Sequence, residues 1–157
     1  MLGTPRLAIA LGACLVAVAA QARAEAPDVA RCAVRVVLAL PQEGGVAPEL
    51  APLNARLTRP PFLHWKTFRQ LSQEEHTLKP GESADYKLPS GRDGKLVYAE
   101  HATLAGGRHV VRGSFRVEGG KSSARTMFAL DEGGSLLIAG HRYDDGILIY
   151  ALSCTAH

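Results

Sequence analysis

Four arginines lie within 18 residues of one another in the C-terminal half of the chain. Arg108, Arg112 and Arg116 are spaced four residues apart, and Arg125 follows in the next apolar segment. Residues separated by an even number share one face of a strand, and guanidinium groups suit carboxylates and phosphates. The spacing predicts a basic face that binds an anion or an acidic partner surface. The alternative is an ordinary solvated sheet face.

A second candidate site is aromatic. Phe62, Trp65 and Phe68 lie within seven residues and would line a groove for a small ligand or a polysaccharide. Large aromatic side chains serve more often as core, which is the alternative interpretation.

Catalytic residue types occur without the spacing that catalysis needs. The sequence has no Gly-x-Ser-x-Gly, no phosphate-binding loop, no dinucleotide fingerprint and no heme-attachment motif. His64, His76 and His141 lack metal-ligand spacing. We therefore expect no catalytic residues, no cofactor and no metal.

The three cysteines indicate where the protein works. Residues 1–24 read as a signal peptide, with an apolar run from Leu7 to Ala20 and a small-x-small cleavage site ending at Ala24. Cys14 lies inside that run, so a lipid anchor there is the weaker alternative. Removing the signal leaves Cys32 and Cys154, and a disulfide between them suits an oxidising compartment. We expect an exported protein of the periplasm or the extracellular space.

The expected mature chain, residues 25–157, suits a single β-rich domain. The signal peptide holds two of the 18 Lys and Arg residues and none of the 15 acidic ones, which leaves a formal charge of only +1. So small an excess argues against nucleic-acid binding. No further segment is long and apolar enough to span a membrane.

The two cysteines also predict how the chain closes. Arg31–Leu40 and Ile147–Cys154 read as strands, with Cys32 and Cys154 each on an apolar face. Cross-strand neighbours in an antiparallel pair lie close enough for a disulfide after a small adjustment. We expect the first and last strands to be adjacent.

Between these strands the pattern predicts mostly antiparallel β-structure. Leu50, Leu53 and Leu57 fall at helical spacing, so one short helix is expected to cover a sheet face. Residues 62–78 are read as extended, and residues 84–88 alternate as in a half-buried strand. The fold class is α+β, mostly antiparallel β: a curved or two-layered meander of six to eight strands with one helix.

Gly-Gly dipeptides at residues 106–107, 119–120 and 133–134 and an Asp-Gly dipeptide at residues 145–146 predict the hairpins of this meander. A two-residue turn at Gly106-Gly107 places Leu96 opposite Val117 and Arg112 opposite His101. The same register puts His101 and His109 on opposite faces. A turn at Gly119-Gly120 places Phe115 opposite Ala124.

Three segments carry a resemblance. Phe62-Leu63-His64-Trp65-Lys66-Thr67-Phe68, Leu88-Pro89-Ser90-Gly91 and Gly146-Ile147-Leu148-Ile149-Tyr150 resemble small exported bacterial proteins that carry no assigned activity. The shorter stretch from Phe128 to Ile149 is similar to the end of a secretin-type outer-membrane domain, over too few residues to transfer a site.

These observations favour a non-catalytic binding or structural module of the cell envelope, an accessory to a secretion or surface assembly with an envelope protein as its partner. One alternative is a small-ligand or polysaccharide binder that uses the aromatic residues near Trp65. The other is a hydrolase without a recognisable motif.

Overall fold

The computed structural model describes residues 29–157. The expected signal peptide, residues 1–24, and Cys14 lie outside the described residues. Within them no helix is long and apolar enough to cross a membrane. The elements follow in this order: β1 Ala30–Leu40, β2 Gly45–Val46, the 3-10 helix η1 Pro48–Leu53, α1 Asn54–Leu57, β3 Thr67–Leu78, β4 Ser83–Lys87, β5 Asp93–Thr103, β6 His109–Gly119, β7 Ser122–Asp131, β8 Ser135–Tyr143 and β9 Gly146–Ala156.

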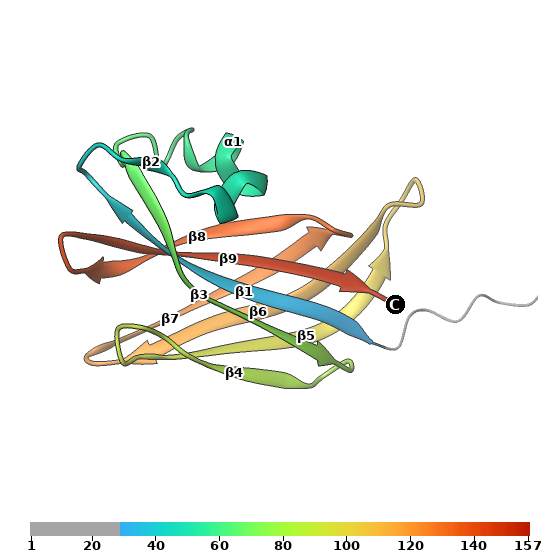
Figure 1. Ribbon diagram of the computed structural model, residues 1–157. Helices are drawn as coiled ribbons and strands as arrows, with labels where there is room; N and C mark the ends of the chain where they lie inside the picture. The colour runs from blue at the N-terminus through green and yellow to red at the C-terminus, as the bar shows by residue number, and fades with distance from the viewer. Residues whose placement is uncertain (1–28) are drawn as a thin grey trace, which may run out of the picture.

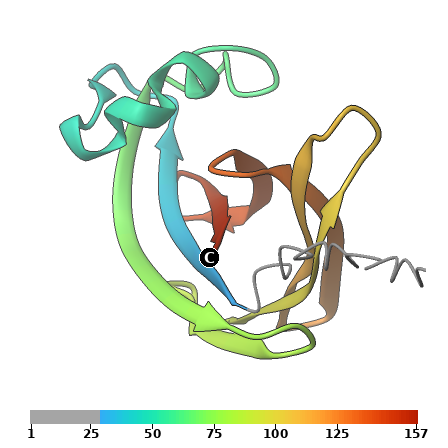
Figure 2. The same ribbon diagram turned by 90° about the vertical axis from the view of Figure 1, so that its right-hand side faces the viewer.

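The strands form two sheets that face each other (Figures 1 and 2). Sheet A has the order β2-β3-β1-β9-β8, and sheet B has the order β4-β5-β6-β7. All strand pairs are antiparallel except the short contact of β2 with β3. The prediction of a mostly antiparallel, two-layered fold with one short helical segment is confirmed.

The main core lies between the sheets, because alternate residues of each strand point inward. Tyr98 and Phe115 of sheet B and Tyr150 and Leu152 of sheet A are each at most 2% exposed there. Sheet A also has a covered outer face. Leu50, Leu53 and Leu57 are buried against it, so the expected role of the leucine helix is confirmed.

This second cover explains why the first and last strands are apolar on both sides. Val37 and Ala39 of β1 and Ile149 and Ala151 of β9 face the helical segment, while their neighbours face the main core. Strands covered on both faces lose the alternation of polar and apolar residues.

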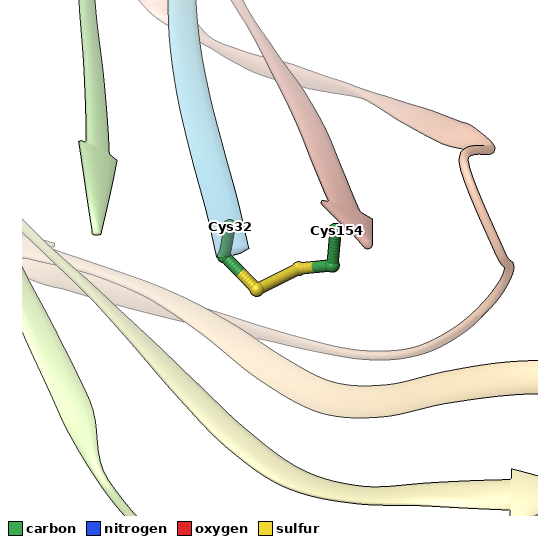
Figure 3. The surroundings of a disulfide bond; sticks show 2 residues. All are labelled: Cys32 and Cys154. Atoms are coloured by element: carbon green, nitrogen blue, oxygen red, sulfur yellow. A yellow bond between two sulfur atoms is a disulfide. The ribbon is translucent and has the colours of Figure 1, made fainter. Parts of the chain in front are cut away.

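The predicted disulfide is present. Cys32 of β1 pairs directly with Cys154 of β9, with their Cα atoms 4.1 Å apart, and the bond links residues 122 positions apart (Figure 3). Both cysteines are at most 1% exposed. The bridge closes the end of sheet A at which the described chain begins and ends.

The predicted meander is wrong at Gly133-Gly134. β7 ends in sheet B, and β8 begins in sheet A, so the two strands are sequence neighbours without being sheet partners. Gly133 adopts a φ of 73°, and Gly134 N–H donates to the Asp131 carbonyl at 2.7 Å. This turn redirects the chain between the layers instead of closing a hairpin. It leaves β7 and β8 as facing sheet edges, which we call the seam.

The predicted registers are also shifted. Leu96 lies opposite Phe115, not Val117, and Phe115 lies opposite Thr126, not Ala124. A shift of two residues keeps each side chain on its predicted face, because the faces alternate every residue. The residues predicted to face inward therefore still do so, although their partners on the neighbouring strand differ from those predicted.

A β-bulge causes the largest departure, in the β5–β6 hairpin. Leu104 N–H donates to the Arg108 carbonyl at 2.8 Å, so the turn has three residues, not two. With that turn alone, inward-facing residues of β6 would lie opposite outward-facing residues of β5. The ladder shifts by one residue between Tyr98 and Glu100, and this bulge brings inward-facing residues of the two strands opposite each other again. Arg112 consequently lies opposite Glu100, not His101.

Candidate functional site

Three of the predicted arginines lie on the outer face of sheet B. Arg116 is directly opposite Arg125 and, on its other side, opposite Lys95, so three basic residues form a row across the sheet. Arg112 is exposed on the same face, whereas Arg108 lies in the β5–β6 connection.

All four arginines already contact a polar neighbour. Arg112 Nη1 lies 2.9 Å from a Glu100 oxygen, and Arg108 Nε lies 3.1 Å from an Asp131 oxygen. Arg116 pairs with Glu118, and Arg125 donates to the Ser114 hydroxyl at 3.2 Å. The face is therefore mixed in charge, and these exposed ion pairs add little stability.

The aromatic candidates lie on the other side of the molecule. Phe62 is 4% exposed and Phe68 is 1% exposed, and both belong to the cluster beneath the helical segment. Trp65 is half-buried and packs against that cluster. These aromatic side chains act mainly as core here. The strand begins only at Thr67, so the predicted extended segment is confirmed from there onward.

The prediction that His101 and His109 lie on opposite faces is wrong. Their rings stack 5.3 Å apart with only 5° between their planes. The bulge in β5 is the reason, because it moves His101 to the face that His109 occupies. His109 Nδ1 lies 3.2 Å from the Thr103 hydroxyl. Across residues 29–157, no group of three or more His, Cys, Asp or Glu side chains is placed to hold a metal ion.

The feature most like a binding site is a cleft of about 200 Å³ between the two sheets at the seam, which we call the seam cleft. Its floor is apolar, and polar groups converge on it from β7, β8, β9 and the β4–β5 turn. The lining residues are Arg92, Phe115, Val117, Ala124, Thr126, Ile138, Ala139, Gly140, His141 and Tyr150.

The seam cleft is open because inward-facing residues of β7 and β8 are not fully covered. Ala124 points inward from β7 and is nevertheless exposed, and Ile138 on β8 is only partly buried. Thr126, on the same face as Ala124, is also only partly buried. A missing ladder between the two strands thus leaves apolar side chains accessible from solvent.

A second β-bulge shapes the wall of the cleft. The β8–β9 ladder shifts between Ala139 and Arg142, so Gly140 and His141 depart from regular pairing. A Cβ at Gly140 would lie 2.7 Å from Tyr150 Cε2 and 2.8 Å from the Leu148 carbonyl oxygen. Only glycine allows this close approach, and the bulge turns His141 toward Tyr150.

His141 and Tyr150 form a hydrogen-bonded pair at the cleft. The Tyr150 hydroxyl lies 3.1 Å from His141 Nδ1, and the buried His141 Nε2 has no hydrogen-bond partner. Burial lowers the pKa of His141, and the nearby positive charge of Arg92 lowers it further. Burial raises the pKa of Tyr150 to about 12 against a smaller opposing effect of Arg92. At neutral pH both side chains are therefore uncharged.

Arg92 reaches the cleft from the turn between β4 and β5. Its side chain lies against the β6–β7 turn, since a Cβ at Gly119 would be 3.0 Å from Arg92 Cγ. Its charge acts on both His141 and Tyr150. The β4–β5 and β6–β7 turns thus lie side by side (Figure 1).

A larger hollow of about 310 Å³ lies on the outer face of sheet A beside the 3-10 helix. Several of its polar groups bond to one another or to residues beside the hollow. Arg35 donates to Gln73 at 3.1 Å and to the Glu49 carbonyl at 3.2 Å, and Glu75 pairs with Arg31 at 3.3 Å. Groups already satisfied in this way offer less to a ligand than the unpartnered nitrogen in the seam cleft.

No family model matches the chain, and neither the curated proteins nor the solved structures contain a significant match. The site must therefore be judged from its own geometry. Sequence reasoning missed Arg92 and Tyr150, and considered His141 only as a metal ligand. One signal was available, because Gly140-His141 interrupts the apolar run of residues 136–139, and a glycine inside a strand often marks a bulge.

Proposed function

We propose that the protein is a non-catalytic binding module of the cell envelope that holds a small ligand in the seam cleft. The observation that carries this proposal is the cleft itself, in which apolar floor residues meet Arg92, His141 and Tyr150. Small-ligand sites characteristically combine apolar walls with a few convergent polar groups.

The lining residues favour binding over hydrolysis. They include no Ser, Cys, Lys, Asp or Glu among the described residues, and Thr126 supplies the one aliphatic hydroxyl. His141 is hydrogen-bonded to Tyr150, whose phenol is a poor nucleophile because burial raises its pKa to about 12. An activated nucleophile needs a base within hydrogen-bond reach and a third group that orients it.

The shape of the seam favours a small ligand over an added partner strand. A regular strand edge is what an incoming peptide pairs with. The bulge at Gly140 and His141 interrupts the β8 edge along the cleft, and bulges of this kind protect edges from such pairing.

Docking of an acidic envelope partner on the arginine face is the second candidate. The row of Lys95, Arg116 and Arg125 favours it. If that face binds, Arg116→Glu should weaken co-purification of a partner under native extraction, whereas Ala124→Trp at the cleft should leave it unchanged. Equal recovery with both variants would remove this candidate.

Two features support the assignment to the envelope. Residues 1–24 predict a signal peptide, and a buried disulfide is typical of proteins outside the cytosol. Cell fractionation should recover a chain beginning at Glu25 in the exported fraction. A chain that retains residue 1 and remains in the cytosol would contradict export.

A neutral probe tests the cleft directly. Titration with 1-hexanol, followed by NMR, should shift the amide signals of Gly140 and His141. Ala124→Trp fills the mouth of the cleft and should abolish these shifts. Ala129→Trp is the matched control, because it places the same side chain at another exposed position of β7, on the opposite face. Equal shifts in both variants would refute the proposed site.

A further inference from the structure

We infer that the ligand of the seam cleft is a small amphiphile with a short apolar segment and an acidic head group. This inference rests on the proposed function and adds the chemical class of the ligand. Three features of the cleft carry it: its charge, its unpartnered nitrogen and its size.

The charge of the lining is one-sided. Arg92 is the only lining residue that is charged at neutral pH among the described residues, and the lining includes no carboxylate. An arginine beside an apolar, partly enclosed surface attracts carboxylate or phosphate and repels cations. Arg92 lowers the pKa of both His141 and Tyr150, which places its positive charge close to each of them.

His141 supplies a second polar contact. Its Nδ1 is engaged by the Tyr150 hydroxyl, and its Nε2 is buried without a partner. A buried polar atom left unsatisfied is costly, and a bound water, ion or ligand group relieves that cost. His141 is only partly buried as a residue, and it lines the cleft. When the Nδ1 nitrogen accepts from Tyr150, Nε2 carries the proton and donates to an acidic oxygen.

The apolar part of the ligand must be short. The cleft holds about 200 Å³, which is less than the roughly 300 Å³ at which sites for drug-sized ligands begin. Phe115, Val117 and Ile138 provide the apolar contact surface. A chain of about six carbons with one acidic group suits a cleft below the lower limit for drug-sized ligands.

Three six-carbon probes separate the contribution of charge from that of apolar burial: hexanoate, 1-hexanol and hexylamine. NMR titration near neutral pH should show hexanoate binding roughly tenfold or more tightly than 1-hexanol, because a hydrogen bond to a charged group stabilises more than a neutral one. Hexylamine, which is protonated at that pH, should bind most weakly.

Variants assign this preference to the cleft. Arg92→Gln should reduce hexanoate affinity to that of 1-hexanol while leaving 1-hexanol affinity unchanged. Arg142→Gln is the matched control, because Arg142 is an exposed arginine next to His141 that does not line the cleft. It should preserve the preference for hexanoate.

Each outcome decides between the claims. If hexanoate and 1-hexanol bind the cleft equally, the acidic head group is refuted and the proposed binding site stands. If hexylamine binds best, the inferred sign of the ligand charge is wrong. If none of the probes shifts the cleft signals at millimolar concentration, both the inference and the small-ligand function fail.

Binding of an extended apolar peptide along β7 or β8, with no response to hexanoate, would also overturn the inference. The wild-type comparison of the three probes decides the question even if Arg92→Gln does not fold.

Discussion

At the scale of single residues, the cleft depends on contacts among Gly140, His141 and Tyr150. Tyr150 is 1% exposed, yet its hydroxyl reaches His141 at 3.1 Å. It therefore links the main core to the polar end of the cleft. A buried phenol of this kind is held protonated, because its charged form would lose hydration.

Tyr150 should make the free energy of unfolding depend on pH in the alkaline range. Its pKa is about 12 in the folded protein, whereas an unfolded tyrosine ionises near 10. Above about pH 10 the unfolded chain loses protons that the folded chain keeps, so stability is complete below that pH and falls as pH rises toward 12. Burial and the charge of Glu74 raise the pKa of Tyr86, which acts in the same direction.

Urea unfolding measured at about pH 9 and about pH 11 tests this dependence. Tyr150→Phe should lose less free energy of unfolding between the two pH values than the wild type does. A loss as large in Tyr150→Phe as in the wild type would show that Tyr150 does not contribute.

At the scale of elements, two bulges determine which side chains reach the seam and the β5–β6 turn. The bulge in β8 turns His141 inward, and the bulge in β5 brings His101 beside His109. Both are accompanied by a glycine with no room for a side chain, since a Cβ at Gly113 would lie 2.3 Å from the Val97 carbonyl oxygen. The irregular positions of these strands are thus built into the sequence.

Gly140→Ala tests the geometry of the β8 bulge. The new methyl group would overlap Tyr150 and the Leu148 carbonyl, so the strand or the ring must shift. We expect the free energy of unfolding to fall by about 1–3 kcal/mol, as for overpacked cores. Ala129→Ser on the exposed outer face of β7 should change it by less than about 0.5 kcal/mol. Equal stability of the two variants would show that the bulge tolerates a side chain.

The sequence predicted the elements of the fold better than their partners. Cys32 and Cys154 identified the adjacent first and last strands, and Leu50, Leu53 and Leu57 identified the cover of sheet A. These are patterns of apolar face and spacing, which a single sequence contains. The change of sheet after β7 was not predictable from Gly133-Gly134, because the same dipeptide suits a hairpin.

The candidate site was harder to predict from the sequence than the fold. His141 and Tyr150 come from the two strands of one hairpin, and Arg92 joins them only when the two sheets pack. Their convergence depends on a one-residue bulge, and the position of a bulge depends on tertiary packing more than on local propensity. The predicted arginine and aromatic sites were instead clusters in sequence, which form the outer face of sheet B and part of the second core.

At the scale of the whole molecule, one end of the fold is covalently closed and the seam is open. The disulfide joins β1 to β9, whereas β7 and β8 face each other without a ladder (Figures 1 and 3). The disulfide holds β9, which carries Tyr150, against β1. It therefore stabilises sheet A without covering the cleft.

Removing the disulfide should lower stability strongly. The bond closes a loop of more than 100 residues, for which the chain-entropy model gives about 4–5 kcal/mol. The double variant Cys32→Ala, Cys154→Ala should lose free energy of unfolding of that order in urea. A loss below about 1 kcal/mol would contradict a structural role, and two free thiols in the native protein by mass spectrometry would show that the bridge does not form.

The position of bound hexanoate tests the central claim most directly. Intermolecular nuclear Overhauser effects should connect its chain protons to the methyl groups of Val117, Thr126 and Ile138. The emission of Trp65, the chain's single tryptophan, should stay unchanged, because Trp65 packs on the opposite face of sheet A. Contacts to Trp65 or to the arginine face, with none to the three methyl-bearing residues, would contradict a ligand site at the seam.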